Sequence, residues 1–181
     1  MAIVAKASGD GQSHTPAPVG VHRAVCVDVL DKGILDVTYQ GKTKKQHKIS
    51  IAWQIDETRD DGKPFLVYKR YTLSLNEKST LRKDLESWRG RAFTREEEMG
   101  FDVENVIGVC CLLNVVHATQ GDKTYANVDS VMPLMKGMPK LDARDYVREI
   151  HRTPTDGDDA GNVREPGSDD HVPLTADDIP F

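Results

Sequence analysis

Four lysines occupy seven consecutive positions of the chain without an acidic residue among them. Lys42, Lys44, Lys45 and Lys48 belong to the polar run 40–48, which we expect to be a loop. So many ammonium groups in one short segment favour contact with phosphates. A solvated turn would also tolerate these lysines, so both interpretations remain open.

Aromatic rings and a guanidinium group lie on the third predicted strand, at 65–75. If the apolar residues of that strand point inward, alternation directs Tyr68 and Arg70 outward, where they could stack on bases. Alternation favours the core for Tyr71, which stays a candidate with burial as an equal alternative. Lys123 and Tyr125, at the last predicted hairpin turn, are further candidates, with ordinary surface as their alternative.

The last five residues have the composition of a docking peptide; they are Asp177, Asp178, Ile179, Pro180 and Phe181. The proline limits the entropy lost on ordering, and the phenylalanine can fill an apolar pocket. The carboxylates can pair with arginine or lysine around that pocket. We therefore expect this tip to bind partner proteins rather than DNA.

The three cysteines do not have the spacing of a metal site. Cys110 and Cys111 are neighbours, so on a strand they point to opposite faces, and Cys26 has no second cysteine near it in sequence. Adjacent cysteines also do not readily form a disulfide with each other. We expect free thiols in the core and no bound metal.

Other catalytic patterns are equally weak. The acidic runs at 60–61 and 96–98 fall in a predicted turn and at a predicted helix start, where carboxylates are usually solvated. The glycines of 9–11 have no strand before them and do not form a phosphate-binding loop. We expect no enzymatic activity and no cofactor.

Hydrophobic periodicity predicts five strands. They are residues 19–30 with a glycine bend and a continuation through 34–39, then 49–56, 65–75, 109–118 and 124–132. The second strand has the cleanest alternation, and its apolar face contains Trp53. Burial tendencies place this indole in the core rather than against DNA.

One helix is predicted between the third and fourth strands. Leu81, Leu85 and Trp88 have i, i+4 and i+7 spacing and would face the core, with Asn76 as N-cap and Gly90 at the C-terminal end. A capping box beginning at Thr94 and a cap at Asp102 predict two further short turns.

Three strands, a helix and two strands are the element order of an oligonucleotide-binding (OB) barrel. We therefore predict a mainly β fold, a five-stranded OB-fold barrel with one helix between strands 3 and 4. Another α+β domain with the same order is the alternative. The predicted organisation is a flexible arm at 1–18, the barrel at 19–135, a candidate short helix within 136–150, and a disordered acidic tail at 151–181.

Composition agrees with one domain plus tails. The chain has 181 residues, 38% of them hydrophobic, and a formal net charge of −5. Residues 151–181 hold two basic and eight acidic residues, whereas 19–82 hold twelve basic and eight acidic, so a cationic region coexists with an acidic total. No run approaches the roughly 18 apolar residues of a membrane span, and we expect a cytoplasmic protein.

Two segments resemble known proteins. SLNEKSTLRKDLESWRGRAFT at 74–94 and CLLNVVH at 111–117 resemble bacteriophage single-stranded DNA-binding proteins with an OB core, over roughly residues 19–135. The C-terminal tip resembles the acidic tip of bacterial and phage members, whose tails recruit replication and repair proteins. The tail lacks the long Gly/Gln-rich linker of cellular members, which leaves their tetrameric state in doubt for this chain.

The resemblance implies sequence-independent binding and protection of single-stranded DNA during phage DNA replication or recombination in a bacterial host cytoplasm. The implied partners are single-stranded DNA and, through the tip, replication or recombination proteins, with a homo-oligomer left open. The alternatives are a recombination mediator or annealing accessory, an RNA-binding OB protein, and an OB barrel that binds only proteins.

Overall fold

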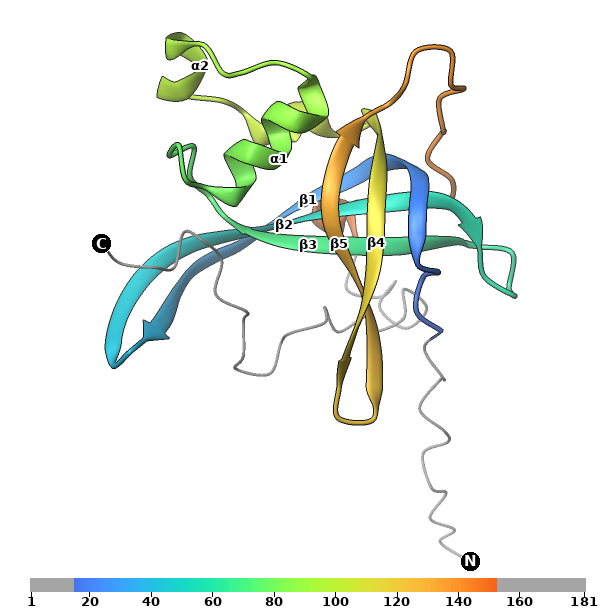
Figure 1. Ribbon diagram of the computed structural model, residues 1–181, viewed down its shortest axis with the longest axis horizontal. Helices are drawn as coiled ribbons and strands as arrows, with labels where there is room; N and C mark the ends of the chain where they lie inside the picture. The colour runs from blue at the N-terminus through green and yellow to red at the C-terminus, as the bar shows by residue number, and fades with distance from the viewer. Residues whose placement is uncertain (1–14, 153–181) are drawn as a thin grey trace, which may run out of the picture.

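The structure is a computed structural model that describes residues 15–152, and its five strands form one antiparallel sheet (Figure 1). The strands are β1 Gly20–Tyr39, β2 Lys42–Thr58, β3 Pro64–Thr72, β4 Cys110–Gln120 and β5 Lys123–Pro133. The short helices are α1 Thr80–Arg89, α2 Arg95–Met99, η1 Val103–Val106 and η2 Glu149–His151. The prediction of a mainly β fold with a helix between the third and fourth strands is confirmed.

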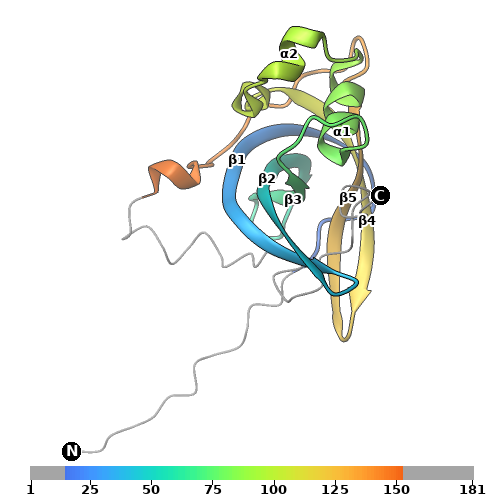
Figure 2. The same cartoon turned by 90° about the vertical axis from the view of Figure 1, so that its left-hand side faces the viewer.

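The sheet order is β3-β2-β1-β4-β5, so the first strand is central. Figure 2 shows β1 curving in a wide arc around β2 and β3. Its pairing with β2 shifts register between Cys26 and Asp28 and again between Asp31 and Gly33, and such bulges bend a strand. The predicted bend at the glycine is confirmed.

The two edge strands approach each other without backbone pairing. Lys69 of β3 donates from Nζ to the main-chain oxygen of Asp129 in β5 at 2.9 Å. The strand pairing includes no β3–β5 ladder, so the curved sheet is not closed.

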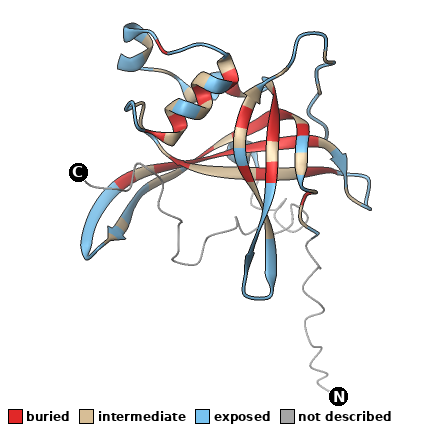
Figure 3. Cartoon of the chain, viewed as in Figure 1, coloured by how far each residue is buried: buried red, intermediate tan, exposed pale blue. Residues whose placement is uncertain are grey.

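The core lies inside the curve and under α1, as the red segments of Figure 3 show. Trp53 of β2 is fully buried, and its ring centroid lies 5.9 Å from that of Trp88. The indole nitrogen of Trp88 donates to the main-chain oxygen of Cys110 at 3.0 Å, which fastens α1 to β4. Both tryptophans are therefore core residues, as predicted for Trp53.

Helix α1 buries the predicted face, Leu81, Leu85 and Trp88, and ends at Gly90 in the left-handed conformation with φ of 67°. Its N-cap is Ser79, whose Oγ accepts from the Arg82 amide, so the prediction of Asn76 was wrong. The helix starts three residues later than expected because the buried Ser79 hydroxyl also donates to the Ser74 main-chain oxygen and holds the preceding turn.

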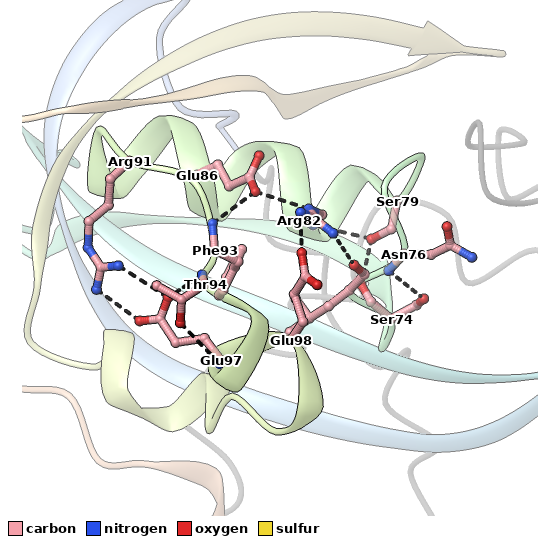
Figure 4. Close-up of polar contacts among 11 residues, drawn as sticks. Ser74, Asn76, Ser79, Arg82, Glu86, Arg91, Phe93, Thr94, Glu97 and Glu98 are labelled. Atoms are coloured by element: carbon pink, nitrogen blue, oxygen red, sulfur yellow. Dashed lines mark hydrogen bonds and ion pairs between the residues drawn. The ribbon is translucent and has the colours of Figure 1, made fainter.

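The charged residues around α1 and α2 pair with one another (Figure 4). Arg82 bridges Glu86 on its own helix, at 3.0 Å, and Glu98 on α2, at 2.6 Å. The predicted capping box of Thr94 and Glu97 is present, and Arg91 also pairs with Glu97. Hydrogen bonds from Arg91 and from the Thr94 amide lower the pKa of Glu97 to about 2.

The two short turns after α1 have the predicted caps. Asp102 accepts from the Glu104 amide at the start of η1, and Thr94 caps α2. Together α1, α2 and η1 form a helical cap, residues 79–106, stacked over one end of the curved sheet (Figure 1).

The boundary of the predicted N-terminal arm was wrong at its inner end. Ala17 is buried in the main core, and its main-chain oxygen accepts from His117 Nε2 at 2.7 Å. The Pro18 main-chain oxygen accepts in the same way from His22. Order therefore begins before the first strand, because these carbonyls satisfy two imidazoles of the sheet.

Cys26 and Cys111 are free thiols in the core, as predicted, whereas Cys110, which is also free, is not fully buried. Burial raises the pKa of the Cys26 thiol to about 12 and that of Cys111 still further. These two thiols are protonated and unreactive at neutral pH.

The segment after β5 does not contain the predicted short helix at 142–150. It is extended except for a turn at 135–138 and the 3-10 turn η2. Tertiary contacts with the sheet, described below, take the place of helical hydrogen bonds. Within the residues described, no helix is long and apolar enough to cross a membrane.

Candidate nucleic-acid interface

The predicted lysine loop is instead a two-stranded arm. Strands β1 and β2 stay paired out to Tyr39 and Lys42 and connect through Gln40 and Gly41, with φ of 47° and 77°. Two consecutive left-handed residues form the tight turn that suits hairpin twist, and glycine adopts this conformation without steric cost. We call residues 34–47 the arm; it projects from the body in Figure 1.

Three of the predicted lysines are displayed on this arm. Lys42, Lys44 and Lys45 are exposed, and none of their ammonium groups forms an ion pair within residues 15–152. Ile34 on the other strand of the arm is also exposed, at 68%. The arm therefore presents positive charge with an apolar side chain beside it.

Lys48 is different, and its assignment as a phosphate contact is corrected. It is only 3% exposed, and its Nζ donates to Thr72 Oγ1 at 2.7 Å. Thr72 Oγ1 in turn donates to Gln46 Oε1 at 3.1 Å. The register pairs Lys48 with Thr72, so the ammonium group lies against β3 rather than in solvent.

Tyr71 is likewise a core residue rather than a stacking residue. Its ring is 2% exposed, and its hydroxyl donates to Asp84 Oδ2 of α1 at 2.8 Å. Burial, reinforced by the Asp84 charge, raises the pKa of the Tyr71 phenol well above its usual value. Lys69, which interrupts the apolar pattern of this strand, reaches the same carboxylate at 2.7 Å. That ion pair explains how a lysine fits on the inner face.

Tyr68 and Arg70 lie on the opposite, outer face of β3, as alternation predicted. Both are half-buried. Tyr68 is paired with Ala52 of β2 and packs against a small apolar cluster, separate from the main core, that Ala52 forms with Val25 and Val27 of β1. The outer face of β1, β2 and β3 thus has an apolar floor with an aromatic ring at one side.

A segment that the sequence did not link to this face covers part of it. We call residues 141–152 the strap. Its Leu141 and Tyr146 side chains pack on the outer cluster. The side-chain amide of Gln54 bonds the backbone of Arg144 twice, donating to its oxygen at 2.6 Å and accepting from its nitrogen at 2.8 Å.

Asp28 of β1 is the main polar anchor of the strap. This carboxylate is fully buried and accepts from Tyr146 Oη at 3.1 Å, Arg148 Nε at 3.0 Å and the Glu149 amide at 2.8 Å. Arg148 also forms an ion pair with Glu104 of η1. A lone acidic residue inside a valine-rich strand was the available signal for Asp28, whereas its partners lie about 120 residues away in sequence.

Lys123 and Tyr125 begin β5 beside the turn of the β4–β5 hairpin. Lys123 is exposed and Tyr125 is half-buried. In Figure 1 this hairpin and the arm project in different directions, so their tips lie apart. The structure brings together Tyr68, Arg70 and the base of the arm, but not the second hairpin. The five residues of the C-terminal tip lie outside the described residues.

No group of histidine, cysteine or acidic residues within 15–152 could hold a metal ion. Comparison of the sequence with protein-family models and with curated proteins gives no match. The physical arrangement of the outer face and the arm is therefore the basis for assigning a role.

Proposed function

We propose that this protein binds single-stranded DNA without sequence preference, along the outer face of β1, β2 and β3 and the arm. In the same proposal the C-terminal tip recruits replication or recombination proteins. The main supporting observation is the continuity of the two regions. The strands that carry the apolar outer face extend directly into an arm with three exposed lysines.

An OB barrel is the proposed architecture. The sheet order, the central curved β1 and the position of α1 between β3 and β4 all support it. The approach of β3 to β5 through Lys69 and Asp129 supports a partly open barrel. Barrels of this kind bind oligonucleotides on the face of strands 2 and 3 and in the adjoining loops.

The chemistry of the two regions suits a single strand. Exposed lysines attract phosphates whatever the base sequence, and a ring such as Tyr68 can stack on any base. Arg70 adds a planar cation on the same strand. A duplex hides its base faces, so an aromatic platform favours unpaired strands.

Fluorescence anisotropy of a labelled oligo-dT tests the proposal. A labelled strand is needed because both tryptophans are buried, so their intrinsic emission would respond little to a ligand on the outer face. We expect binding that weakens with salt, ignores base order and is stronger than binding of a duplex of equal length. Absence of binding at low salt would refute the proposal, and preference for an RNA strand would redirect it to the RNA-binding alternative.

The stacking platform is tested by Tyr68→Ala. Loss of one stacked base costs about 1–3 kcal/mol of binding free energy, so affinity should fall roughly 5- to 150-fold. Tyr125→Ala is the matched control, because it removes a half-buried tyrosine from the other hairpin. Equal losses of affinity in both variants, or a loss only in the control, would contradict the placement of the binding site on the outer face of β3.

A further inference from the structure

The strap covers the same face on which the proposed function places the DNA strand. Tyr146 lies on Val25, Val27 and Ala52, the floor that Tyr68 also borders. Tyr68 and Tyr146 both pack against this cluster of three residues, so the two side chains border the same small apolar surface. Bases cannot occupy the floor beside Tyr68 while the Tyr146 ring is there, since two rings cannot fill one site.

The attachment of the strap is local rather than continuous. It adds no strand to the sheet, and its regular structure is a single turn, Glu149–His151. The polar anchors of the strap are Asp28, Gln54 and Glu104, and Cys110 Sγ donates to the Leu141 main-chain oxygen at 3.2 Å. Val147, which lies between anchored residues, is 55% exposed, and Ile150, which follows the last of them, is 66% exposed.

Such a segment can leave without unfolding the sheet. Segments with few buried contacts and exposed backbone open at a free energy well below that of global unfolding. On opening, Asp28 passes from the interior to water, where its charge is solvated, and the main core under α1 keeps its contacts. The apolar floor is uncovered at the same time, which leaves it ready for another apolar or aromatic partner.

We propose that the strap is a displaceable lid, latched to Asp28 by Tyr146 and Arg148, that competes with the nucleic-acid strand for the outer face. This inference rests on the proposed function, because it assigns regulation to the same site. Binding then requires opening, and the apparent affinity equals the intrinsic affinity multiplied by the fraction of open molecules. A protein that held the strap away would strengthen DNA binding without touching DNA.

A different role for the strap makes the opposite prediction. Arg144, Arg148 and Arg152 could extend the cationic surface, in which case the strap would add phosphate contacts. Loss of the latch would then weaken binding. The sign of the change in affinity distinguishes a lid from an added surface.

The test uses the full chain with Tyr146→Ala and Arg148→Ala combined. The matched control combines Arg144→Ala with Val147→Ala. It removes one arginine and one other side chain from the same strap, but Arg144 bonds Gln54 through its backbone and both side chains are exposed. The control therefore measures the electrostatic loss alone.

Opening is measured first, without DNA, by the rate at which a thiol reagent modifies Cys110. The strap lies on this half-buried thiol, while Cys26 and Cys111 are buried in the main core. We expect faster modification of Cys110 in the latch variant than in the control and the unmodified chain, with Cys26 and Cys111 slow in all three. An unchanged rate would overturn the latch.

Affinity for labelled oligo-dT is measured second. If the lid is closed in about nine molecules of ten, the latch variant should bind up to about tenfold more tightly than the control. Faster Cys110 modification with equal or weaker binding would overturn the lid while leaving the proposed function intact. Absence of binding by both the unmodified chain and the opened variant would refute the proposed function and the lid together.

Discussion

The helical cap and the arm use charge in opposite ways. In the cap, arginines and glutamates neutralise one another at short range, as Arg82 does with Glu86 and Glu98. In the arm, Lys42, Lys44 and Lys45 are exposed on a hairpin that bonds β3 at its base, through Gln46 and Thr72. Charge in the cap stabilises the fold, whereas charge in the arm is available to a ligand.

This difference bears on the resemblance to phage single-stranded DNA-binding proteins. Most of this resemblance lies in the segment 74–94. In the structure that segment contains α1 with its N-cap and ends at Thr94, the N-cap of α2. The resemblance of this segment therefore concerns how the domain is built. The residues that would contact DNA lie elsewhere, on β1, β2 and β3, so the function must be tested on those strands.

The largest expected effect is a loss of oligo-dT affinity when the lysines of the arm are removed. Replacing Lys42, Lys44 and Lys45 by alanine removes three potential phosphate contacts, each worth about 0.7 in the slope of log affinity against log salt for a single strand. At 0.1 M salt the variant should bind oligo-dT about 100-fold more weakly, with an unchanged melting temperature. Anisotropy titrations at several salt concentrations measure both quantities.

The control for the arm comes from the cap. Lys83→Ala with Arg95→Ala also removes exposed cations, from α1 and α2, and should change neither the affinity nor the salt slope appreciably. Equal weakening in the two variants would mean that only the total charge matters, and the distinction between the regions would fail.

Much of the framework could be predicted from local pattern. The alternation in β2 and the spacing of Leu81, Leu85 and Trp88 each reflect one buried face, and the structure has both. The capping box at Thr94 depends on residues three positions apart and was also predicted. Local signals identified these features because the interactions themselves are local, although they placed the N-cap of α1 at Asn76 instead of Ser79.

Apart from the N-cap of α1 and the hairpin at 40–41, the errors concern residues whose partners are distant in sequence. From the sequence alone, Lys48 is predicted to be exposed like the lysines before it, because its hydrogen bond to Thr72 across the sheet is not evident. Tyr71 is held by Asp84 of the following helix, and the strap is held by Asp28 of the first strand. Pattern alone cannot supply such partners, because they depend on strand register and on the curvature of the sheet.

A smaller effect, on the free energy of unfolding, tests which residue is the N-cap of α1. Ser79→Ala removes the N-cap oxygen of α1 and should lower the free energy of unfolding by about 1 kcal/mol. Asn76→Ala, at the position that the sequence favoured as the cap, should change it by less than about 0.5 kcal/mol. Urea denaturation of both variants measures the difference, and the opposite ranking would place the helix start at the earlier residue.

The smallest expected effect is a pH dependence confined to the cap. The pKa of Glu97 is lowered from 4.5 to about 2, first by its hydrogen bonds with Arg91 and then by the Thr94 amide. A carboxylate with a depressed pKa contributes stability that is complete above its unfolded pKa and is lost on protonation. The contribution should therefore be constant above about pH 5 and decline as the pH falls from 4.5 toward 2.

Urea midpoints of the unmodified chain and Glu97→Gln, compared from pH 7 down to pH 2, measure this contribution. The gap between them should narrow on acidification, because protonation makes Glu97 resemble the uncharged glutamine. Glu96→Gln, an exposed neighbour on the same helix, should show no comparable gap at any pH. Oligo-dT affinity of Glu97→Gln at neutral pH should match that of the unmodified chain, since the cap supports the sheet and leaves the outer face and the arm unchanged. Absence of a gap between Glu97→Gln and the unmodified chain at pH 7 would mean that the ion pairs of Glu97 with arginine contribute no net stability. A gap that persists unchanged at pH 2 would mean that it does not arise from the charge that Glu97 loses on protonation.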